Sequence, residues 1–123
     1  MEFLVIAIVA LLVVGVFRYF RQKNYLKVLT EQQFREGYRK AQLIDVREPQ
    51  EFDKGHILGA RNIPLTQMKQ RLIEMRPDKP VYLYCQSGSR SARAAQLLNK
   101  KGYTDIYQLK GGFKKWTGKI KAK

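Results

Sequence analysis

Apolar positions along the chain occur in short continuous runs that alternate with helical spacings. Runs typical of buried strands lie at residues 25–29, 42–45, 60–63, 81–85 and 106–109. Helical patterns or turns follow them at residues 30–38, 49–52, 66–75, 89–101 and from residue 112. Short strands separated by helices predict an α/β domain, with a parallel sheet that helices cover on both faces.

Individual residues sharpen some of these boundaries. Thr30 and Gln33 have the spacing of a capping box, which predicts a helix that begins after Thr30. Gly102 follows the long helical pattern as a glycine follows a helix C-terminus. The pattern at 66–75 predicts an amphipathic helix with the apolar residues Met68, Leu72, Ile73 and Met75.

Residues 3–17 form an apolar run without a charged side chain, which predicts a membrane anchor. As a helix this run rises about 22 Å, and Tyr19 with Phe20 extends it to near 27 Å, close to a hydrocarbon core of roughly 30 Å. A cleaved signal peptide is the main alternative, and a buried core helix is a third. The chain starts Met1-Glu2 and has no small-residue cleavage site after the run, so an uncleaved anchor is favoured.

We therefore expect a transmembrane anchor at residues 1–20, one compact domain at 21–118 and a basic, solvated tail at 119–123. The net charge of +14 is concentrated beside the anchor and near the C-terminus. Basic residues follow the apolar run at positions 18, 21, 23, 27, 35, 39 and 40, which by the positive-inside rule places the domain in the cytoplasm. Further lysines lie at positions 110, 114, 115, 119, 121 and 123.

The two basic flanks favour attraction to anionic lipid head groups. No recognised nucleic-acid-binding motif accompanies the charge, so we expect no nucleic-acid partner. The localisation predicted from these features is the cell membrane, with a single pass and the domain facing the cytoplasm.

Cys85, the only cysteine, ends the apolar run at 81–85, and a polar loop and a helical pattern follow it. Ligands of open α/β sheets bind outside the carboxyl ends of the strands, which is where this thiol is placed. A buried cysteine that acts as a small hydrophobic residue is the alternative. The polar sequence Gln-Ser-Gly-Ser-Arg after Cys85 is atypical of a core segment and favours a nucleophile.

Three features of this loop favour the thiolate, which is the nucleophilic form of cysteine. Gly88 permits a turn in which successive backbone N–H groups point inward. The helix that follows carries positive partial charge at its N-terminus. Arg90 and Arg93 add full positive charges nearby.

Four segments in order, at residues 43–52, 55–64, 84–90 and 111–116, resemble the signature segments of single-domain rhodaneses. The resemblance covers residues 25 to 118. It implies a rhodanese-like three-layer domain with a small parallel sheet flanked by helices, preceded here by the transmembrane helix. It also implies a sulfurtransferase that needs no cofactor and no metal.

By this resemblance, Cys85 attacks a sulfane sulfur donor, thiosulfate or a persulfide, and carries the sulfur as a persulfide. An external acceptor then takes the sulfur: cyanide, a small thiol, or a protein such as thioredoxin. No second cysteine in the chain can resolve the persulfide, and the lack of a pair is consistent with a reducing compartment.

The resemblance also assigns roles around Cys85. Asp45 and Arg47 act as structural support for neighbouring loops. Arg90 additionally helps to fix the loop and the positive electrostatic field around Cys85. The donor and the persulfide are bound by the backbone N–H groups of Gln86, Ser87, Gly88, Ser89 and Arg90.

The loop from Cys85 to Arg90 is one residue shorter than in related phosphatase-type and arsenate-reducing members, which favours sulfur over phosphate chemistry. Some thiosulfate-using members carry a cation after the cysteine, whereas this chain has neutral Gln86. A persulfide on a small thiol or a protein is therefore favoured as donor. A membrane-tethered binding or recruitment module with little turnover is the rival interpretation.

Several other residues have both a structural and a functional interpretation. Ser87, Ser89 and Ser91 are candidates either for anion binding or for helix capping, and Ser89 is the better cap candidate. His56, the only histidine, is expected to be structural rather than a general base. We expect Phe113 and Trp116 to pack the end of the domain.

Overall fold

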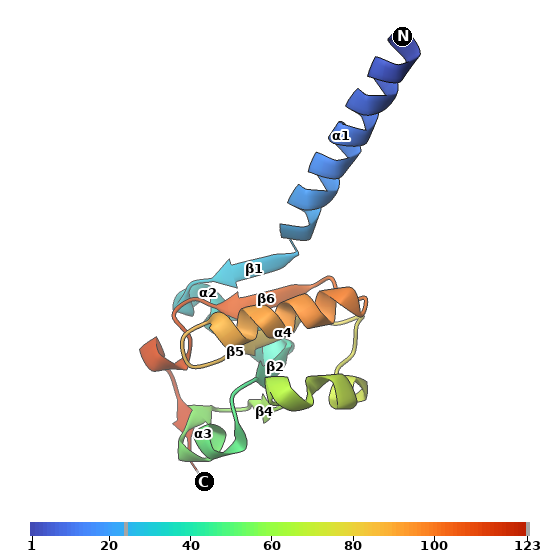
Figure 1. The fold of residues 1–123 in the computed structure, drawn as a ribbon. Helices are drawn as coiled ribbons and strands as arrows, with labels where there is room; N and C mark the ends of the chain where they lie inside the picture. Colours follow the sequence, from blue (N-terminus) through green and yellow to red (C-terminus); the bar gives the residue numbers. More distant parts are fainter. Residues whose placement is uncertain (24, 123) are drawn as a thin grey trace.

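The computed structural model describes residues 1–23 and 25–122, without the side chains of residues 20–23. Helix α1 (Glu2–Lys23) extends away from the rest of the molecule (Figure 1), and its side chains up to residue 19 are exposed. By length and composition α1 is long and apolar enough to cross a membrane, as an anchor or as a signal sequence. The apolar run therefore does form one continuous helix.

Five parallel strands form the main sheet in the order β1-β6-β5-β2-β4. Their bounds are Leu26–Leu29 for β1, Ile106–Leu109 for β6, Val81–Tyr84 for β5, Gln42–Asp45 for β2 and Arg61–Asn62 for β4. Because all pairs are parallel, the carboxyl ends of the central strands meet at one edge. This confirms the predicted α/β class with a parallel sheet flanked by helices.

Helices connect the strands and cover both faces of the sheet (Figure 1). Their bounds are Glu31–Gly37 for α2, Pro49–Lys54 for α3 and Ser89–Lys100 for α4, with 3₁₀ helices at Tyr38–Lys40 (η1), Leu65–Glu74 (η2) and Phe113–Lys115 (η3). The capping box at the start of α2 is present as predicted, because Gln33 N–H donates to Thr30 Oγ1 and Thr30 N–H donates to Gln33 Oε1. Gly102 has a φ of 96° after α4, as its predicted capping position requires.

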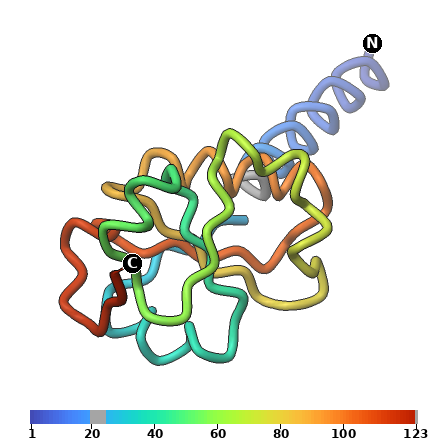
Figure 2. Tube along the Cα trace, turned by 90° about the horizontal axis from the view of Figure 1, so that it is seen from below, coloured from blue at the N-terminus to red at the C-terminus, as the bar shows by residue number. Residues whose placement is uncertain are grey.

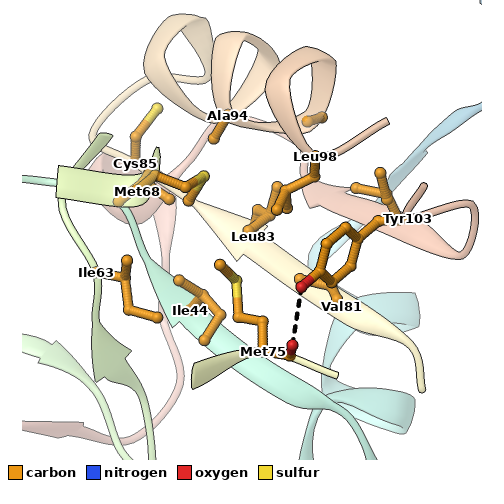
Figure 3. Close-up of a cluster of buried hydrophobic side chains, with 13 residues drawn as sticks. Ile44, Ile63, Met68, Met75, Val81, Leu83, Cys85, Ala94, Leu98 and Tyr103 are labelled. Atoms are coloured by element: carbon orange, nitrogen blue, oxygen red, sulfur yellow. Dashed lines mark hydrogen bonds between the residues drawn. The ribbon is translucent and has the colours of Figure 1, made fainter. Parts of the chain in front are cut away.

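Two hydrophobic clusters lie on opposite faces of the sheet. One packs beneath α4 and η2 and includes Leu83 of β5 together with Cys85 (Figure 3). Within it, Tyr103 Oη donates a 2.8 Å hydrogen bond to the carbonyl of Met75. The second cluster consists of Phe34, Tyr38, Leu43, Ile57, Tyr84 and Leu109. The two clusters give the expected layers of helix, sheet and helix.

The segment predicted as one amphipathic helix at 66–75 is instead the 3₁₀ element η2, which changes direction at Arg71 (φ −117°, ψ 20°). Bonds of the 3₁₀ type link Gln67 N–H to Pro64 O and Met75 N–H to Leu72 O. The change in direction keeps Met75 buried but leaves Ile73 95% exposed. Ile73 therefore does not belong to the buried face.

Part of the expected solvated tail at residues 119–123 is a strand in the structure. Ile120–Lys121 form β7, which pairs antiparallel with β3 (His56–Ile57). Figure 2 shows the C-terminal end of the chain beside this part of the domain. The side chains of both β7 residues are exposed to solvent, as expected for a tail. Their backbone, however, is held by the pairing with β3 and by the hydrogen bond from Leu58 N–H to Lys119 O. Lys123 lies outside the described residues.

Candidate active site

Cys85 lies directly after β5, a central strand of the sheet, and its side chain is only 1% exposed. Figure 3 shows the thiol near the N-terminal end of α4, close to Met68. The short connection from β5 to α4 runs through Gln86, Ser87 and Gly88. The sequence therefore placed the thiol correctly at the carboxyl end of a strand, although the side chain itself is buried.

Three hydrogen-bonding groups converge on the sulfur of Cys85. Gly88 N–H donates at 3.0 Å, Ser91 N–H donates at 3.3 Å, and Ser91 Oγ lies at 3.4 Å. Burial alone would raise the pKa of the thiol, but the Ser91 hydroxyl and the backbone N–H groups of Ser91, Gly88 and Ser87 together lower it. These hydrogen bonds favour the thiolate form of Cys85 over the neutral thiol.

Gly88 makes this convergence possible. Its φ of 125° lies in the region that L side chains rarely adopt, and it is the N-cap of α4 without any side-chain capping bond. The expectation that Ser89 caps this helix is therefore wrong, because Ser89 is already the first helical residue and is exposed. The serine that acts at this end of the helix is Ser91, whose Oγ lies 3.0 Å from Gly88 O.

Arg90 fixes the loop to a neighbouring helix. Its guanidinium forms a bidentate pair with Glu51 of α3, at 2.6 Å from Nη1 to Oε1 and 2.9 Å from Nη2 to Oε2. Chiefly through the hydrogen bond from Arg90, the pKa of Glu51 falls to about 2. Arg93, in contrast, is exposed on α4.

A second, buried ion pair supports the loop from the side of β2. Arg47 (2% exposed) contacts both carboxylate oxygens of Asp45 (0% exposed), with Nη2 2.7 Å from Oδ2. The same guanidinium donates to Gly55 O at 2.6 Å and to Gln86 Oε1 at 3.2 Å, and lies 4.3 Å from the ring centroid of Phe113. Burial disfavours the charged guanidinium, but its bonds to Asp45 outweigh this and raise the pKa of Arg47. The Gln86 carboxamide is thus tied to the scaffold.

The carbonyl groups of the loop are occupied by the turn at η3. Phe113 N–H donates to Cys85 O at 2.8 Å and Lys114 N–H donates to Gln86 O at 3.1 Å. Gly112 allows this approach with a φ of 67°, because a Cβ there would lie 2.5 Å from Gln86 O and 2.7 Å from Cys85 O. With these carbonyls directed toward η3, the N–H groups of Gly88 and Ser91 and the hydroxyl of Ser91 face the sulfur.

The remaining candidates pack within the scaffold. The ring of His56 stacks on Phe52, with centroids 3.6 Å apart, and its Nδ1 lies 2.8 Å from Phe52 O. Trp116 makes edge contacts with Phe34 and Tyr38 in the second cluster. Within residues 1–23 and 25–122, no group of three or more His, Cys, Asp or Glu residues is arranged to hold a metal ion.

Two residues of this site were not found from the sequence. The sequence around Glu51 indicates only a role in helix capping, because Glu51 is the third residue of α3 and completes a capping box with Glu48. Gln108 of β6 lies 2.6 Å from Gly88 O and 2.7 Å from Ser91 Oγ through its Nε2. In the sequence, Gln108 is distinguished only as an amide within a predicted strand of otherwise apolar and aromatic residues. The structure shows that its side chain is buried.

Comparison with known proteins agrees with this geometry. Residues 30–119 match the Rhodanese-like domain family. The chain is 71% identical to the uncharacterized protein YqhL of Bacillus subtilis (strain 168) over 105 residues, which cover 85% of this chain and 83% of that protein. It is 37% identical over 76 residues to the thiosulfate sulfurtransferase GlpE of Pseudomonas aeruginosa (strain LESB58), covering 62% of this chain and 69% of that enzyme.

Among solved structures, a rhodanese-related protein from Thermoplasma volcanium superposes with a TM-score of 0.72 at 26% identity, covering 79% of this chain and 99% of that one. The match therefore extends over nearly the whole of that chain. Taken together with the fold and the loop after β5, these likenesses show that the chain belongs to the rhodanese-like domain family.

Proposed function

We propose that this protein is a sulfurtransferase in which Cys85 accepts a sulfane sulfur and carries it as a persulfide. The observation that supports this most strongly is the convergence of Gly88 N–H, Ser91 N–H and Ser91 Oγ on the sulfur of Cys85. These groups stabilise a thiolate, which is the form that attacks a sulfur donor. Thiosulfate sulfurtransferase activity in a relative 37% identical to the chain supports the same chemistry.

The transfer consists of two displacements. In the first, the thiolate attacks the outer sulfur of the donor, a bond from Sγ to that sulfur forms, and the donor's own sulfur–sulfur bond breaks. Thiosulfate would release sulfite, and a persulfide would release a thiolate, each leaving with the electron pair. In the second, an acceptor nucleophile attacks the outer sulfur and Sγ leaves again as a thiolate. No external oxidant or reductant is consumed.

In this scheme the loop has two tasks. The N–H groups of Gly88 and Ser91 stabilise Sγ whenever it is anionic, before the first displacement and after the second. The backbone of residues 86–90 binds the anionic donor and the outer sulfur. Asp45 and Arg47 hold the loop in place through the contacts of Arg47 with Gln86 and Gly55.

The donor that fits this site best is a persulfide. The side chain that follows Cys85 is the neutral amide of Gln86, whose oxygen accepts a hydrogen bond from Arg47. No additional cation is therefore placed at that position for the doubly charged thiosulfate. The acceptor comes from outside the chain, because Cys85 is its only cysteine: cyanide in an assay, a small thiol, or a protein such as thioredoxin.

We further propose that α1 is an uncleaved single-pass anchor and that the domain faces the cytoplasm. The apolar stretch of α1, with Tyr19 and Phe20, rises about 27 Å, close to a hydrocarbon core of roughly 30 Å. Positive charge lies on the carboxyl side of the apolar run. Protease should then digest the domain in inside-out but not in right-side-out vesicles, and the membrane-extracted chain should retain its N-terminal residues. The reverse digestion pattern would contradict the orientation.

Turnover provides the direct test of the enzymatic proposal. The full chain in detergent micelles should convert cyanide to thiocyanate in the presence of a sulfane donor, and folded Cys85→Ser should not. Arylphosphate should remain unchanged under the same conditions, which would exclude the phosphatase alternative. Equal turnover by Cys85→Ser would refute the proposal.

A membrane recruitment module is the second candidate, and the near-complete burial of the Cys85 side chain favours it. In that case Cys85→Ser should leave partner recruitment to the membrane intact. If sulfur transfer is the role instead, Cys85→Ser should abolish the function of the protein.

A further inference from the structure

Gln108 connects β6 to the active-site loop. Its side chain is 7% exposed, and in the sheet its Cα is paired with that of Leu83, two residues before Cys85. Its Nε2 lies 2.6 Å from Gly88 O and 2.7 Å from Ser91 Oγ. Gln108 does not contact the reacting sulfur, but it contacts two groups that determine how that sulfur is stabilised.

The chemistry of the contacts fixes the orientation of the amide. A backbone carbonyl can only accept hydrogen bonds, so the atom 2.6 Å from Gly88 O is the NH₂ group of Gln108. The second hydrogen of that NH₂ group is then available to Ser91 Oγ. Ser91 Oγ accepts this bond, and its own single proton remains to be donated elsewhere.

Two acceptors compete for the proton of Ser91. Gly88 O lies 3.0 Å from Ser91 Oγ, and Cys85 Sγ lies 3.4 Å from it. When Cys85 is a neutral thiol, its S–H donates to Ser91 Oγ and the hydroxyl donates to Gly88 O. When Cys85 loses its proton to water, the sulfur becomes an acceptor and the hydroxyl can turn toward it.

Rotation of the Ser91 hydroxyl away from Gly88 O removes one donor from this half-buried carbonyl, which also accepts a hydrogen bond from Ala92 N–H at 3.1 Å. Gln108 and Ala92 N–H together fill both lone pairs of Gly88 O, so the proton of Ser91 can leave this carbonyl at little cost. We propose that Gln108 is a positioning residue that frees the hydroxyl proton of Ser91 to follow the charge on Cys85. The inference rests on the proposed function, in which Sγ is an anion before and after transfer and a neutral sulfur in the persulfide.

The charged groups beside the loop are the same in all the variants that are compared. Arg90 is paired with Glu51 of α3, and Arg47 is paired with Asp45 of β2. Both pairs remain in variants of Ser91 and Gln108, so a change in Cys85 ionisation between these variants reports on the hydrogen bonds and not on these charges.

The test is a double-mutant cycle on the full chain in detergent micelles. The rate of Cys85 alkylation by iodoacetamide is measured against pH for the wild type, Gln108→Met, Ser91→Ala and the double variant. Methionine keeps the length of glutamine but has no donor. Gln96→Met, on an exposed position of α4, is the matched control. No sulfur donor is present, so the result is readable even if sulfur transfer is not the function.

On this proposal Gln108→Met lowers the alkylation rate at acidic pH by about fivefold, as the net value of one hydrogen bond to Gly88 O implies, because Ala92 N–H still donates to that carbonyl. The midpoint of the profile moves to higher pH, while the plateau rate at high pH is unchanged. In the Ser91→Ala background the same substitution has less than about a twofold effect, because no hydroxyl proton remains to be freed. Gln96→Met matches the wild type.

An equal loss from Gln108→Met with and without Ser91 would overturn the proposal, as would a changed plateau with an unchanged midpoint. If Gln108→Met does not fold, the side-chain amide of Gln108 is observed by NMR in the wild type and in Ser91→Ala. Its resonances should move with the ionisation of Cys85 in the wild type and much less in Ser91→Ala. Resonances that do not follow Cys85 ionisation in the wild type would likewise refute the role.

Discussion

The guanidinium of Arg90 and the carboxylate of Glu51 form a bidentate pair that joins the loop after Cys85 to helix α3. About a third of each side chain is exposed, so the solvent screens the pair in part. The two residues lie far apart in the sequence, and their pairing sets the position of the N-terminus of α4 relative to the preceding β2–α3 segment. The pair is therefore a conformational restraint on the active-site loop.

Glu51→Gln should lower the free energy of unfolding by about 0.5–1 kcal/mol at pH 7. The pKa of Glu51 is about 2 in the folded state and lies at its usual, higher value in the unfolded chain. A lowered folded pKa gives stability that is complete above the unfolded pKa and is lost as the pH falls toward 2. Urea unfolding should show the difference from wild type shrinking over that range. Glu36→Gln, on an exposed position of α2, is the control and should show no such difference.

Arg47→Lys should destabilise the domain by about 3 kcal/mol, because the pair with Asp45 is buried and a lysine cannot make the same set of bonds. The hydrogen bonds that the Arg47 guanidinium donates to Gly55 O and Gln86 Oε1 would also be lost. Arg76→Lys breaks an exposed pair with Asp78 and should change stability by less than about 0.5 kcal/mol. Similar losses from the two variants in urea unfolding would contradict the importance of the buried pair.

Gly112→Ala should damage both stability and sulfur transfer. A Cβ at this position would meet the backbone of residues 85 and 86, and the φ of 67° adds strain. Gly102→Ala is a matched control, because its φ of 96° is also positive but nothing lies within 4 Å of the added Cβ. Both variants should lose about 1 kcal/mol or more of stability. Only Gly112→Ala should also lose persulfide formation in the fraction that remains folded.

The sequence predicted the elements that are specified locally. The bounds of β2 were predicted at Gln42–Asp45, and the start of α4 at Ser89, because apolar runs and the glycine-containing loop mark them. The pairing of β3 with β7 was not predicted, since strands of two residues have no periodicity to detect. The contacts of Gln108 were missed for a related reason: they join β6 to a loop twenty residues earlier, and nothing in the local sequence indicates such a pairing.

Gln86→Lys should raise activity with thiosulfate more than activity with a persulfide donor. The substitution adds a cation beside Cys85 and removes the amide oxygen that accepts a bond from Arg47. A doubly charged donor gains more from this cation than a singly charged one does. We expect about a fivefold or larger rise in the ratio of the two kcat/KM values, with Gln96→Lys as a charge-matched control on α4. An unchanged ratio would show that position 86 does not select the donor.

Persulfide formation on Cys85 is tested directly by the intact mass of the full chain after incubation with a persulfide donor, and separately with thiosulfate. We expect a gain of one sulfur atom at Cys85, absent from folded Cys85→Ser and removed by cyanide or by a thiol. The gain should be greater with the persulfide donor. A folded wild-type protein that gains no sulfur from either donor would refute sulfur transfer by Cys85 and favour the membrane recruitment module.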